Sequence, residues 1–248
     1  MPLVADIGNT RTKLGLFYRE GFKKMATTDV RRDVIEAFVC SDDIDGVIIS
    51  SVVPSSTQRL IDVLGELTPH TPLLVTHTLD TGLTLAVEHP QRLGTDRIVV
   101  AAYAYHYFGT AVAVVDLGTV TTISVVDSGG RLLGGALIPG IDMMLESLTS
   151  NTALLPHVGG DTLAALTQDL QPIGNNTQKA IASGTVLATV GAIQYIIDQT
   201  QVRLGCRVNI ALTGGNYPLI APFISRTDLA DSNLSLKGLN YLYGRTRA

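Results

Sequence analysis

The stretch that decides the fold is residues 4–12, which read Val-Ala-Asp-Ile-Gly-Asn-Thr-Arg-Thr. It aligns without gaps on residues 114–122, which read Val-Val-Asp-Leu-Gly-Thr-Val-Thr-Thr, at an offset of 110. Both copies share the frame Val-x-Asp-(aliphatic)-Gly-(Asn or Thr)-x-x-Thr, and a β-rich stretch follows each. Internal repetition indicates a repeated architecture. The sequence therefore predicts two homologous lobes that divide near Gly109-Thr110.

Around each copy, short apolar strands alternate with amphipathic or apolar helices. The first half predicts strands at 2–5, 12–18, 22–27, 46–52, 72–76 and 83–87, and helices at 31–39, 55–67 and 96–108. The helix at 55–67 is expected to open with Pro54 and a serine cap. The second half predicts strands at 111–115, 121–126, 131–137 and 207–212, and helices at 141–149, 162–170, 177–202 and 219–224. This alternation is typical of an α/β architecture.

The composition is apolar and poor in charge. Of 248 residues, 46% are hydrophobic and 16% are charged, against about 25% charged in an average soluble domain. These values exclude disordered and collagen-like classes, and a net charge of −4 without a basic stripe argues against a nucleic-acid partner. The shortage of charge indicates either membrane association or an outer surface that a partner covers.

The membrane interpretation fails at the longest uncharged run, residues 98–115, because Phe108-Gly109-Thr110 breaks it. Asp6 interrupts the first apolar run, so no signal peptide is expected. The sequence therefore predicts a soluble, cytoplasmic protein. Cys40 and Cys206 form no C-x-x-C pair, and the histidines show no metal-ligand spacing. The remaining shortage of charge predicts a homodimer interface on helices near Ile141–Leu148 and Thr185–Ile197.

The repeated hairpin suits an anionic ligand. Glycine lets the backbone approach a ligand closely, and successive N–H groups in such a turn form an anion-binding concavity. Lys13 adds a positive charge, Asp6 or Asp116 can hold Mg²⁺ beside phosphates, and hydroxyl donors come from Thr10, Thr12, Thr119, Thr121 and Thr122. Two facing copies would hold a polyphosphate from both sides. A plain β-hairpin is the alternative interpretation, since Asp and Gly are ordinary turn residues.

Two further segments carry candidate chemistry. Residues 212–216, Leu-Thr-Gly-Gly-Asn, join a strand to a helix and suit either close approach of a nucleoside or simply a tight turn. Asp96 opens an apolar helix beside Arg97, so it is either a base that accepts a hydroxyl proton or a helix cap. The G-x-x-x-x-G-K-[ST] and G-x-G-x-x-G fingerprints are absent.

The elements Asp-x-Gly-Asn-Thr, Asp-x-Gly-Thr and Thr-Gly-Gly resemble, in this order, the phosphate 1, phosphate 2 and adenosine motifs of the actin, sugar-kinase and heat-shock ATPase superfamily. Within it the chain is most similar to the type III pantothenate kinases, over essentially its whole length. The resemblance includes Leu-Gly-Thr-Asp-Arg at 93–97, Gly-Gly-Ala-Leu-Ile-Pro-Gly at 134–140, Thr-Ala-Leu-Leu-Pro at 152–156, Asn176-Thr177 and Ser183-Gly184.

The resemblance implies two tandem ribonuclease H-like lobes, 1–110 and 111–248, each a mixed sheet flanked by helices, with the active-site cleft between them. It implies ATP-dependent phosphorylation of pantothenate to 4'-phosphopantothenate, the first step of coenzyme A synthesis, by a homodimer. Mg²⁺ would accompany ATP at Asp6, and Asp116 would take part in a site for potassium or ammonium. ATP would contact Asp6, Ile7, Gly8, Asn9, Thr10, Arg11, Thr12, Lys13, Thr119, Gly214 and Gly215.

The same resemblance makes Asp96 the catalytic base and places pantothenate against Val87, Gly94, Thr95, Asp96, Arg97 and Thr177. Val87 departs from the family, which usually has Tyr there, and Glu88-His89-Pro90 stands where Asp-Asn-Pro is more usual. Tyr103 and Tyr105 are candidates to replace that ring in space. Because of the departure, two alternatives stay open: a non-catalytic nucleotide-binding accessory or regulatory protein, and a kinase for another small hydroxy acid.

Overall fold

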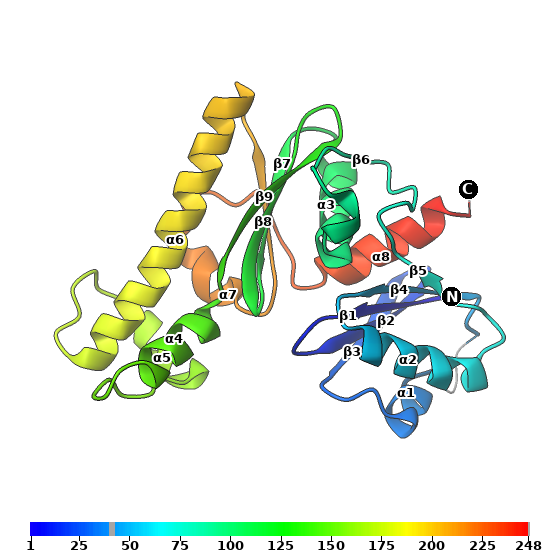
Figure 1. Cartoon of the computed structure of the whole chain (residues 1–248), viewed down its shortest axis with the longest axis horizontal. Coiled ribbons are helices and arrows are strands. Elements are labelled where there is room, and N and C mark those ends of the chain that lie inside the picture. Colours follow the sequence, from blue (N-terminus) through cyan, green and yellow to red (C-terminus); the bar gives the residue numbers. More distant parts are fainter. Residues whose placement is uncertain (40–42, 248) are drawn as a thin grey trace. The chain divides into compact units, whose positions relative to one another are not determined.

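A computed structural model describes residues 1–39 and 43–247 and is an α/β structure (Figure 1). The chain forms two compact units. Unit 1 comprises 1–107, 130–132 and the residues from 233 onward, and unit 2 comprises 108–129 and 133–232. The chain first passes from unit 1 to unit 2 after residue 107, three residues before the expected division at 110. The residues from 233 onward return to unit 1, although the sequence predicted them in the second lobe. Cys40 lies outside the described residues.

Unit 1 is built on a mixed sheet of strand order β3-β2-β1-β4-β5. The central strand β1 (Pro2–Ile7) runs antiparallel to β2 (Thr12–Tyr18) and parallel to β4 (Gly46–Ser51). The outer strands are β3 (Gly21–Thr27) and β5 (Leu73–Leu74). Two helices, α1 (Arg32–Val39) and α2 (Pro54–Leu67), pack on the face that carries Leu3, Ala5 and Ile7.

The opposite face of this sheet packs against α3 (Thr95–Phe108) and α8 (Leu234–Arg245). Because side chains alternate along a strand, this face carries Val4 and Ile48, which join Val99, Leu236 and Leu239 in a second core. Before α3 come the short strand β6 (Thr84–Leu85) and the 3₁₀ turn η1 (Pro90–Arg92). β6 pairs in parallel with Arg131 and Leu132, the first residues of β9.

The sequence did not predict α8, and its packing explains why it forms. A Cβ atom at Gly238 would lie 2.7 Å from both the carbonyl oxygen and Cγ1 of Val99, so only glycine lets α8 approach α3 this closely. Leu236, Leu239 and Leu242 on the same helix are almost fully buried. Tertiary packing, not helix propensity, therefore stabilises α8.

Unit 2 contains the sheet β11-β10-β7-β8-β9. The antiparallel hairpin of β7 (Val112–Leu117) and β8 (Val120–Val126) leads into β9 (Arg131–Pro139), and β10 (Asn209–Thr213) and β11 (Leu229–Ala230) extend the sheet in parallel to β7. Its other elements are α4 (Ile141–Ser150), α5 (Gly160–Thr167), α6 (Thr177–Leu204), α7 (Tyr217–Ile220) and η2 (Ala221–Phe223). The core lies where α4, α5 and α6 cover the sheet.

Helix α6, drawn in yellow in Figure 1, has 28 residues. Among the described residues it is the one helix long and apolar enough to cross a membrane, with a mean hydropathy of 1.6 over its most apolar 18 residues. Half of that window is buried inside the protein. A buried core helix meets the same criteria, and Ile181, Val186 and Ile193 lie in the core of unit 2.

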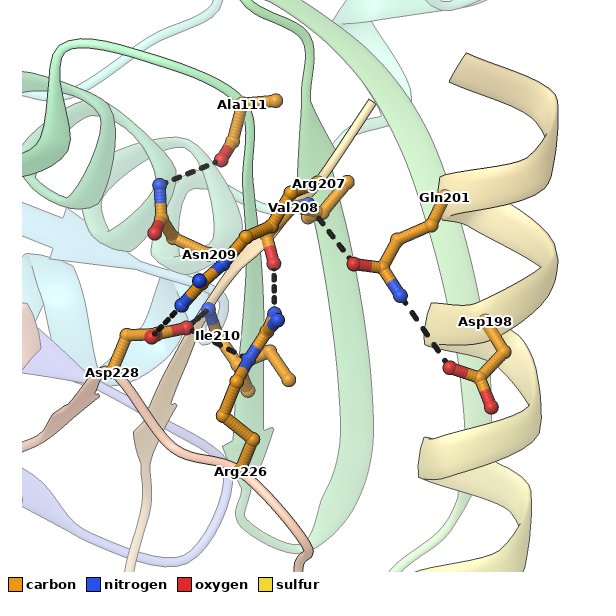
Figure 2. Close-up of polar contacts among 9 residues, drawn as sticks. All are labelled: Ala111, Asp198, Gln201, Arg207, Val208, Asn209, Ile210, Arg226 and Asp228. Carbon is orange, nitrogen blue, oxygen red and sulfur yellow. Dashed lines mark hydrogen bonds and ion pairs between the residues drawn. The ribbon is translucent and has the colours of Figure 1, made fainter. Parts of the chain in front are cut away.

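Asp228 fixes the start of β10, as Figure 2 shows. One carboxylate oxygen accepts a hydrogen bond from Arg207 Nη2 at 2.9 Å, and the other accepts one from the backbone N–H of Ile210 at 2.9 Å. The Nε atom of Arg226 lies 3.3 Å from the second oxygen, and Arg226 also donates to the carbonyl oxygen of Val208. This cluster holds β10, which ends at the Thr-Gly-Gly segment, in register.

The two hairpins are equivalent, but the gap-free alignment is wrong after the turn. In the first hairpin Ile7 pairs with Thr12, which leaves a turn of four residues. In the second Leu117 pairs with Thr121, which leaves three. Thr122, opposite Asp116, therefore corresponds to Lys13, opposite Asp6. The second turn is one residue shorter, so only the first hairpin carries a lysine at this position.

The expected serine cap of α2 is also wrong. Val53 occupies the cap position without a side-chain hydrogen bond, and Pro54 is the first helical residue. The Ser51 hydroxyl instead accepts a hydrogen bond from the backbone N–H of Val53 at 3.0 Å. Proline suits the first turn because it has no N–H to satisfy, so the helix begins without a serine cap.

Candidate functional site

Polar side chains gather in unit 1 where β1 and β4 end. Asp6 lies on the face of β1 that carries Val4, and it pairs with Lys13 on β2 and with Ser50 on β4. The preceding residues on this face belong to the core with α3 and α8. Strand alternation therefore places Asp6, Lys13 and Ser50 side by side at one end of an apolar face.

Burial raises the pKa of the Asp6 carboxyl above its ordinary value of 3.8. Lys13 and a hydrogen-bonding interaction with Ser235 lower this pKa, whereas the negative charge of Asp96 raises it. The carboxylates of Asp6 and Asp96 thus lie close enough to repel each other, with one lysine nearby. A bound cation would relieve this repulsion, and Mg²⁺ is commonly held by one or two carboxylates together with substrate phosphates.

Thr95 fixes the start of α3 to the end of β4. Its hydroxyl donates to the carbonyl oxygen of Ser51 at 3.1 Å, accepts from the Ser51 N–H at 3.2 Å and lies 2.9 Å from Ser50 Oγ. These contacts satisfy a hydroxyl that the sequence assigned to pantothenate. The contacts hold Asp96, the next residue, at the same end of the sheet as Asp6.

Asp96 lies one residue inside α3, so it is not the N-terminal cap itself. Its Oδ1 atom accepts a hydrogen bond from the backbone N–H of Arg97 at 2.8 Å, which satisfies one free donor of the first turn. Asp96 therefore satisfies a free N–H of the first turn, as the capping interpretation expected, but from inside the helix and with only one of its two carboxylate oxygens. Burial lowers the pKa of the half-buried Arg97 while Asp96 raises it, and the guanidinium stays charged.

The turn of the first hairpin closes through a hydrogen bond from the Gly8 N–H to the Arg11 carbonyl oxygen at 3.1 Å. Asn9, Thr10 and Arg11 are exposed at its tip, whereas Ile7 and Thr12 at its base are buried. The exposed tip can contact a ligand. Ile7 and Thr12, which pair across the hairpin, hold the turn in place.

In unit 2 the Thr-Gly-Gly segment lies against the end of β7. Thr213 pairs with Asp116, and the Asn216 N–H donates to the Leu117 carbonyl oxygen at 3.0 Å. Gly214 has a φ of +96°, and a Cβ atom there would lie 2.5 Å from Asp116 Oδ1. The structure therefore brings together two motifs that the sequence identified separately, and glycine is required for that contact.

A hollow of about 660 Å³ adjoins this segment. Gly215 and Asn216 form one wall. The other lining residues come from the start of α4, from α5 and from α7 and η2, and they include Asp142, Leu163, Ala164, Pro218, Leu219 and Phe223. Its volume and largely apolar lining with a few polar groups are typical of small-molecule sites. Thr119, the other predicted ATP contact in this unit, is exposed in the turn between β7 and β8.

Thr177 is exposed at the first position of α6, next to the capping Asn176, whose side chain accepts from the Lys179 N–H at 2.9 Å. It lines a second hollow of unit 2, of about 670 Å³, between α4 and α6. This hollow is mostly apolar and includes Met143, Met144, Leu148, Leu155 and Ile181. Thr177 is thus one of three hydroxyl residues, with Ser147 and Thr185, in an otherwise mostly apolar groove.

Tyr103 and Tyr105, the candidates to replace the ring missing at Val87, both lie on α3. Tyr103 lies seven residues after Asp96, which corresponds to about 10 Å along a helix, and it packs edge-on against Tyr241. Tyr105 packs against Gly130. The half-buried Val87 lies two residues after the end of β6.

Among residues 1–39 and 43–247, no three or more histidine, cysteine, aspartate or glutamate side chains gather as a metal cluster. A metal that depends on substrate phosphates for most of its ligands needs no such cluster. Sequence reasoning missed Ser50 and Ser235 at the Asp6 end of the sheet. Ser50 was within reach of prediction, because it lies near the end of a buried strand next to β1. Ser235 was not, because it lies in the first turn of a helix that the sequence did not predict.

Comparisons with known proteins place the chain in a family. The family described as type III pantothenate kinase matches residues 2–199. Type III pantothenate kinases from Moorella thermoacetica and Thermomicrobium roseum are 31% and 35% identical, each over 99% of this chain and over 99% and 97% of their own length. The fold is similar, with a TM-score of 0.53 and 12% identity, to the activator of 2-hydroxyisocaproyl-CoA dehydratase from Clostridium difficile with bound ADPNP, over 99% of this chain and 97% of that one.

The family match covers most of the chain, and the relatives align from end to end. The matched range includes the Asp6 hairpin and the Gly94–Arg97 segment, which unit 1 brings to one end of its sheet. The protein belongs to the type III pantothenate kinase family.

Proposed function

We propose that this protein phosphorylates pantothenate with ATP, the first step of coenzyme A synthesis, and that the Asp6, Lys13 and Asp96 cluster carries the reaction. The observation that supports this most strongly is the closeness of the two carboxylates and the lysine at the end of β1. Phosphoryl transfer needs charge neutralisation, alignment and a group to accept a proton, and this cluster offers all three.

The first hairpin contacts the phosphates of ATP. The exposed backbone and side chains of residues 8–11 face the ligand, and Lys13 supplies a positive charge to the transferred group. Mg²⁺ bound together with ATP would neutralise phosphate charge. Asp6 would hold the ion directly or through water, which would offset the cost of keeping a buried carboxylate ionised next to Asp96.

Asp96 is the base. It accepts the proton of the primary hydroxyl as the hydroxyl oxygen bonds to the γ-phosphorus and the bond to the β–γ bridging oxygen breaks, so that ADP leaves. The hydrogen bond from the Arg97 N–H holds Oδ1 and orients the carboxylate, so Oδ2 is the oxygen that receives the proton. Arg97 binds the carboxylate of pantothenate through its planar guanidinium. The binding site for pantothenate is lined by Gly94, Thr95 and Val87.

In unit 2, Gly214 and Gly215 contact adenosine, and the adjoining hollow of about 660 Å³ receives the nucleoside. Thr119 contacts a phosphate. Asp116 takes part in a site for a monovalent cation, potassium or ammonium, together with backbone carbonyl oxygens, which are the ligands that hard cations prefer. Replacing potassium with sodium in the assay tests this role.

The protein is a homodimer in the cytoplasm, and α4 and α6 form the interface. The groove lined by Met143, Met144 and Leu148 is apolar, and Tyr195 on the outer side of α6 is 67% exposed. Apolar helix faces of this kind are typical of permanent interfaces. Static light scattering is expected to give about twice the 26.3 kDa of one chain, and a monomer mass at all concentrations would refute the dimer.

A coupled assay for ADP release tests the function. With ATP, Mg²⁺ and potassium, pantothenate is expected to stimulate ADP release, and mass spectrometry is expected to find one phosphate on the acceptor. Val87 favours the two alternatives, because it removes a ring usual in the family. Release with another small hydroxy acid but not with pantothenate would indicate a different kinase. Nucleotide binding without turnover on any acceptor would indicate an accessory protein.

A further inference from the structure

Ser235 has a buried hydroxyl in the first turn of α8. The residue is 5% exposed, and among the described residues its Oγ atom makes no hydrogen bond of ordinary geometry. Its neighbours Leu234 and Leu236 are almost fully buried. Burying an unsatisfied hydroxyl costs free energy, so packing alone gives no reason for serine here.

The hydroxyl lies beside Asp6. Helix α8 packs on the face of β1 that carries Val4, through Leu236 and Leu239, and Asp6 is two residues farther along the same face. Ser235 lowers the pKa of Asp6 through a hydrogen-bonding interaction, although the pair falls short of ordinary hydrogen-bond geometry. The Ser235 hydroxyl therefore lies near the Asp6 carboxylate without forming a full hydrogen bond to it.

The charged groups around Asp6 indicate what the Ser235 hydroxyl can do. Lys13 lies across the β1–β2 ladder, and Asp96 repels the carboxylate from the side of α3. A carboxylate that uses one oxygen for a cation needs its other oxygen held, because ligand orientation depends on such outer hydrogen bonds. Ser235 is the described hydroxyl that influences Asp6 from α8.

We infer that Ser235 is a positioning residue, whose hydroxyl donates to the Asp6 carboxylate when Asp6 holds the Mg²⁺ that accompanies ATP. The C-terminal helix thereby contributes to the phosphate site formed by the first hairpin. This inference rests on the proposed role of Asp6 toward Mg²⁺–ATP. It does not depend on which acceptor is phosphorylated.

Substitution of Ser235 separates a structural role from a positioning role, because the two roles affect different quantities. Alanine has a higher helix propensity than serine and carries no hydroxyl to desolvate, so Ser235→Ala is expected to fold with an unchanged or higher unfolding midpoint. A positioning role predicts that the same variant binds Mg²⁺–ATP poorly. Stability and ligand binding are therefore expected to change in different directions.

The experiment compares wild type, Ser235→Ala, Ser235→Thr and the control Ser55→Ala, whose side chain is exposed on α2. Calorimetry measures ATP affinity with Mg²⁺ and with a chelator, and denaturant unfolding measures stability. We expect Ser235→Ala to lose about tenfold in ATP affinity with Mg²⁺ and less than twofold in the chelator, as outer-ligand substitutions do. Ser235→Thr, which keeps the hydroxyl, is expected to recover most of the affinity.

In the ADP-release assay at saturating ATP, the Mg²⁺ concentration for half-maximal rate is expected to rise about tenfold in Ser235→Ala, with kcat at saturating Mg²⁺ within threefold of wild type. The inference would be overturned if Ser235→Ala bound ATP in the presence of Mg²⁺ as tightly as wild type. It would also be overturned if the variant lost ATP affinity equally with Mg²⁺ and with the chelator. Calorimetry needs no acceptor, so a wild type that binds Mg²⁺–ATP but does not phosphorylate pantothenate would refute the proposed function while still testing Ser235.

Discussion

The contact between α8 and α3 yields a quantitative prediction for Gly238→Ala. A Cβ atom there would lie 2.7 Å from the Val99 carbonyl oxygen, whereas ordinary contacts lie at 3.4–4 Å. The backbone of α3 cannot rotate away as a flexible side chain would, so the clash belongs at the upper end of overpacking costs, about 3 kcal/mol. Alanine returns about 1 kcal/mol of helix propensity. The net loss in the free energy of unfolding is therefore about 2 kcal/mol.

Gly244 provides the matched control in the same helix. It is exposed, and a Cβ atom there would meet nothing within 4 Å. Gly244→Ala is expected to leave stability unchanged or to raise it by about 0.5 kcal/mol. The chain has no tryptophan, so far-ultraviolet circular dichroism in urea is the suitable readout. If Gly238→Ala were as stable as Gly244→Ala, the packing of α8 on α3 described above would be wrong.

Three further substitutions test other parts of the structure. Asp228→Ala leaves two arginines and the Ile210 N–H without their shared acceptor, so urea unfolding is expected to show a loss of about 2–3 kcal/mol; a loss below 0.5 would contradict the cluster. The pKa of Asp80 is held below 3.8, first by the Gly82 N–H and then by Arg245, so its contribution to stability is present above pH 3.8 and disappears as pH falls below it. In Arg245→Gln, NMR titration is expected to find the Asp80 pKa raised toward 3.8, and no change would refute the pairing. Gly214→Ala, at a φ of +96° and against Asp116, is expected to weaken ATP binding at least tenfold by calorimetry, and wild-type affinity would contradict the predicted contact.

Much of the fold followed from the sequence because the signals were local. The hairpin strands β2 and β8 and the helices α3, α4 and α6 begin and end within two residues of their predicted bounds. Expected strands at 72–76 and 83–87 shrink to two residues each, β5 and β6, because each pairs with its neighbour over two residues only. Such pairing depends on tertiary contacts that apolar runs do not reveal.

Helix α8 was missed for a related reason. Its glycines lower helix propensity, and one of them is required by a contact with α3, which no local pattern shows. The same limit applies to the candidate site. Asp6, Lys13 and Asp96 stand in motifs and were predicted, but Ser235 reaches Asp6 only because α8 returns to unit 1 across more than 220 residues of sequence.

The repeat shows what a sequence alignment alone leaves open. The match of residues 4–12 to 114–122 correctly predicted two equivalent hairpins. A one-residue difference in turn length was invisible, because Thr121 and Thr122 fit the pattern equally well. Strand pairing settles the register and assigns the lysine to the first hairpin alone. This asymmetry is consistent with placing the charged chemistry in unit 1.

The most direct test of the central claim, that the Asp6–Asp96 end of unit 1 phosphorylates pantothenate, is the turnover of Asp96→Asn at saturating ATP, Mg²⁺ and pantothenate. Asp62→Asn, an exposed carboxylate on α2, is the control. The account predicts a fall in kcat of about 10²–10⁴-fold for Asp96→Asn with ATP affinity retained by calorimetry, and wild-type turnover for Asp62→Asn. Near-normal turnover of Asp96→Asn would contradict it.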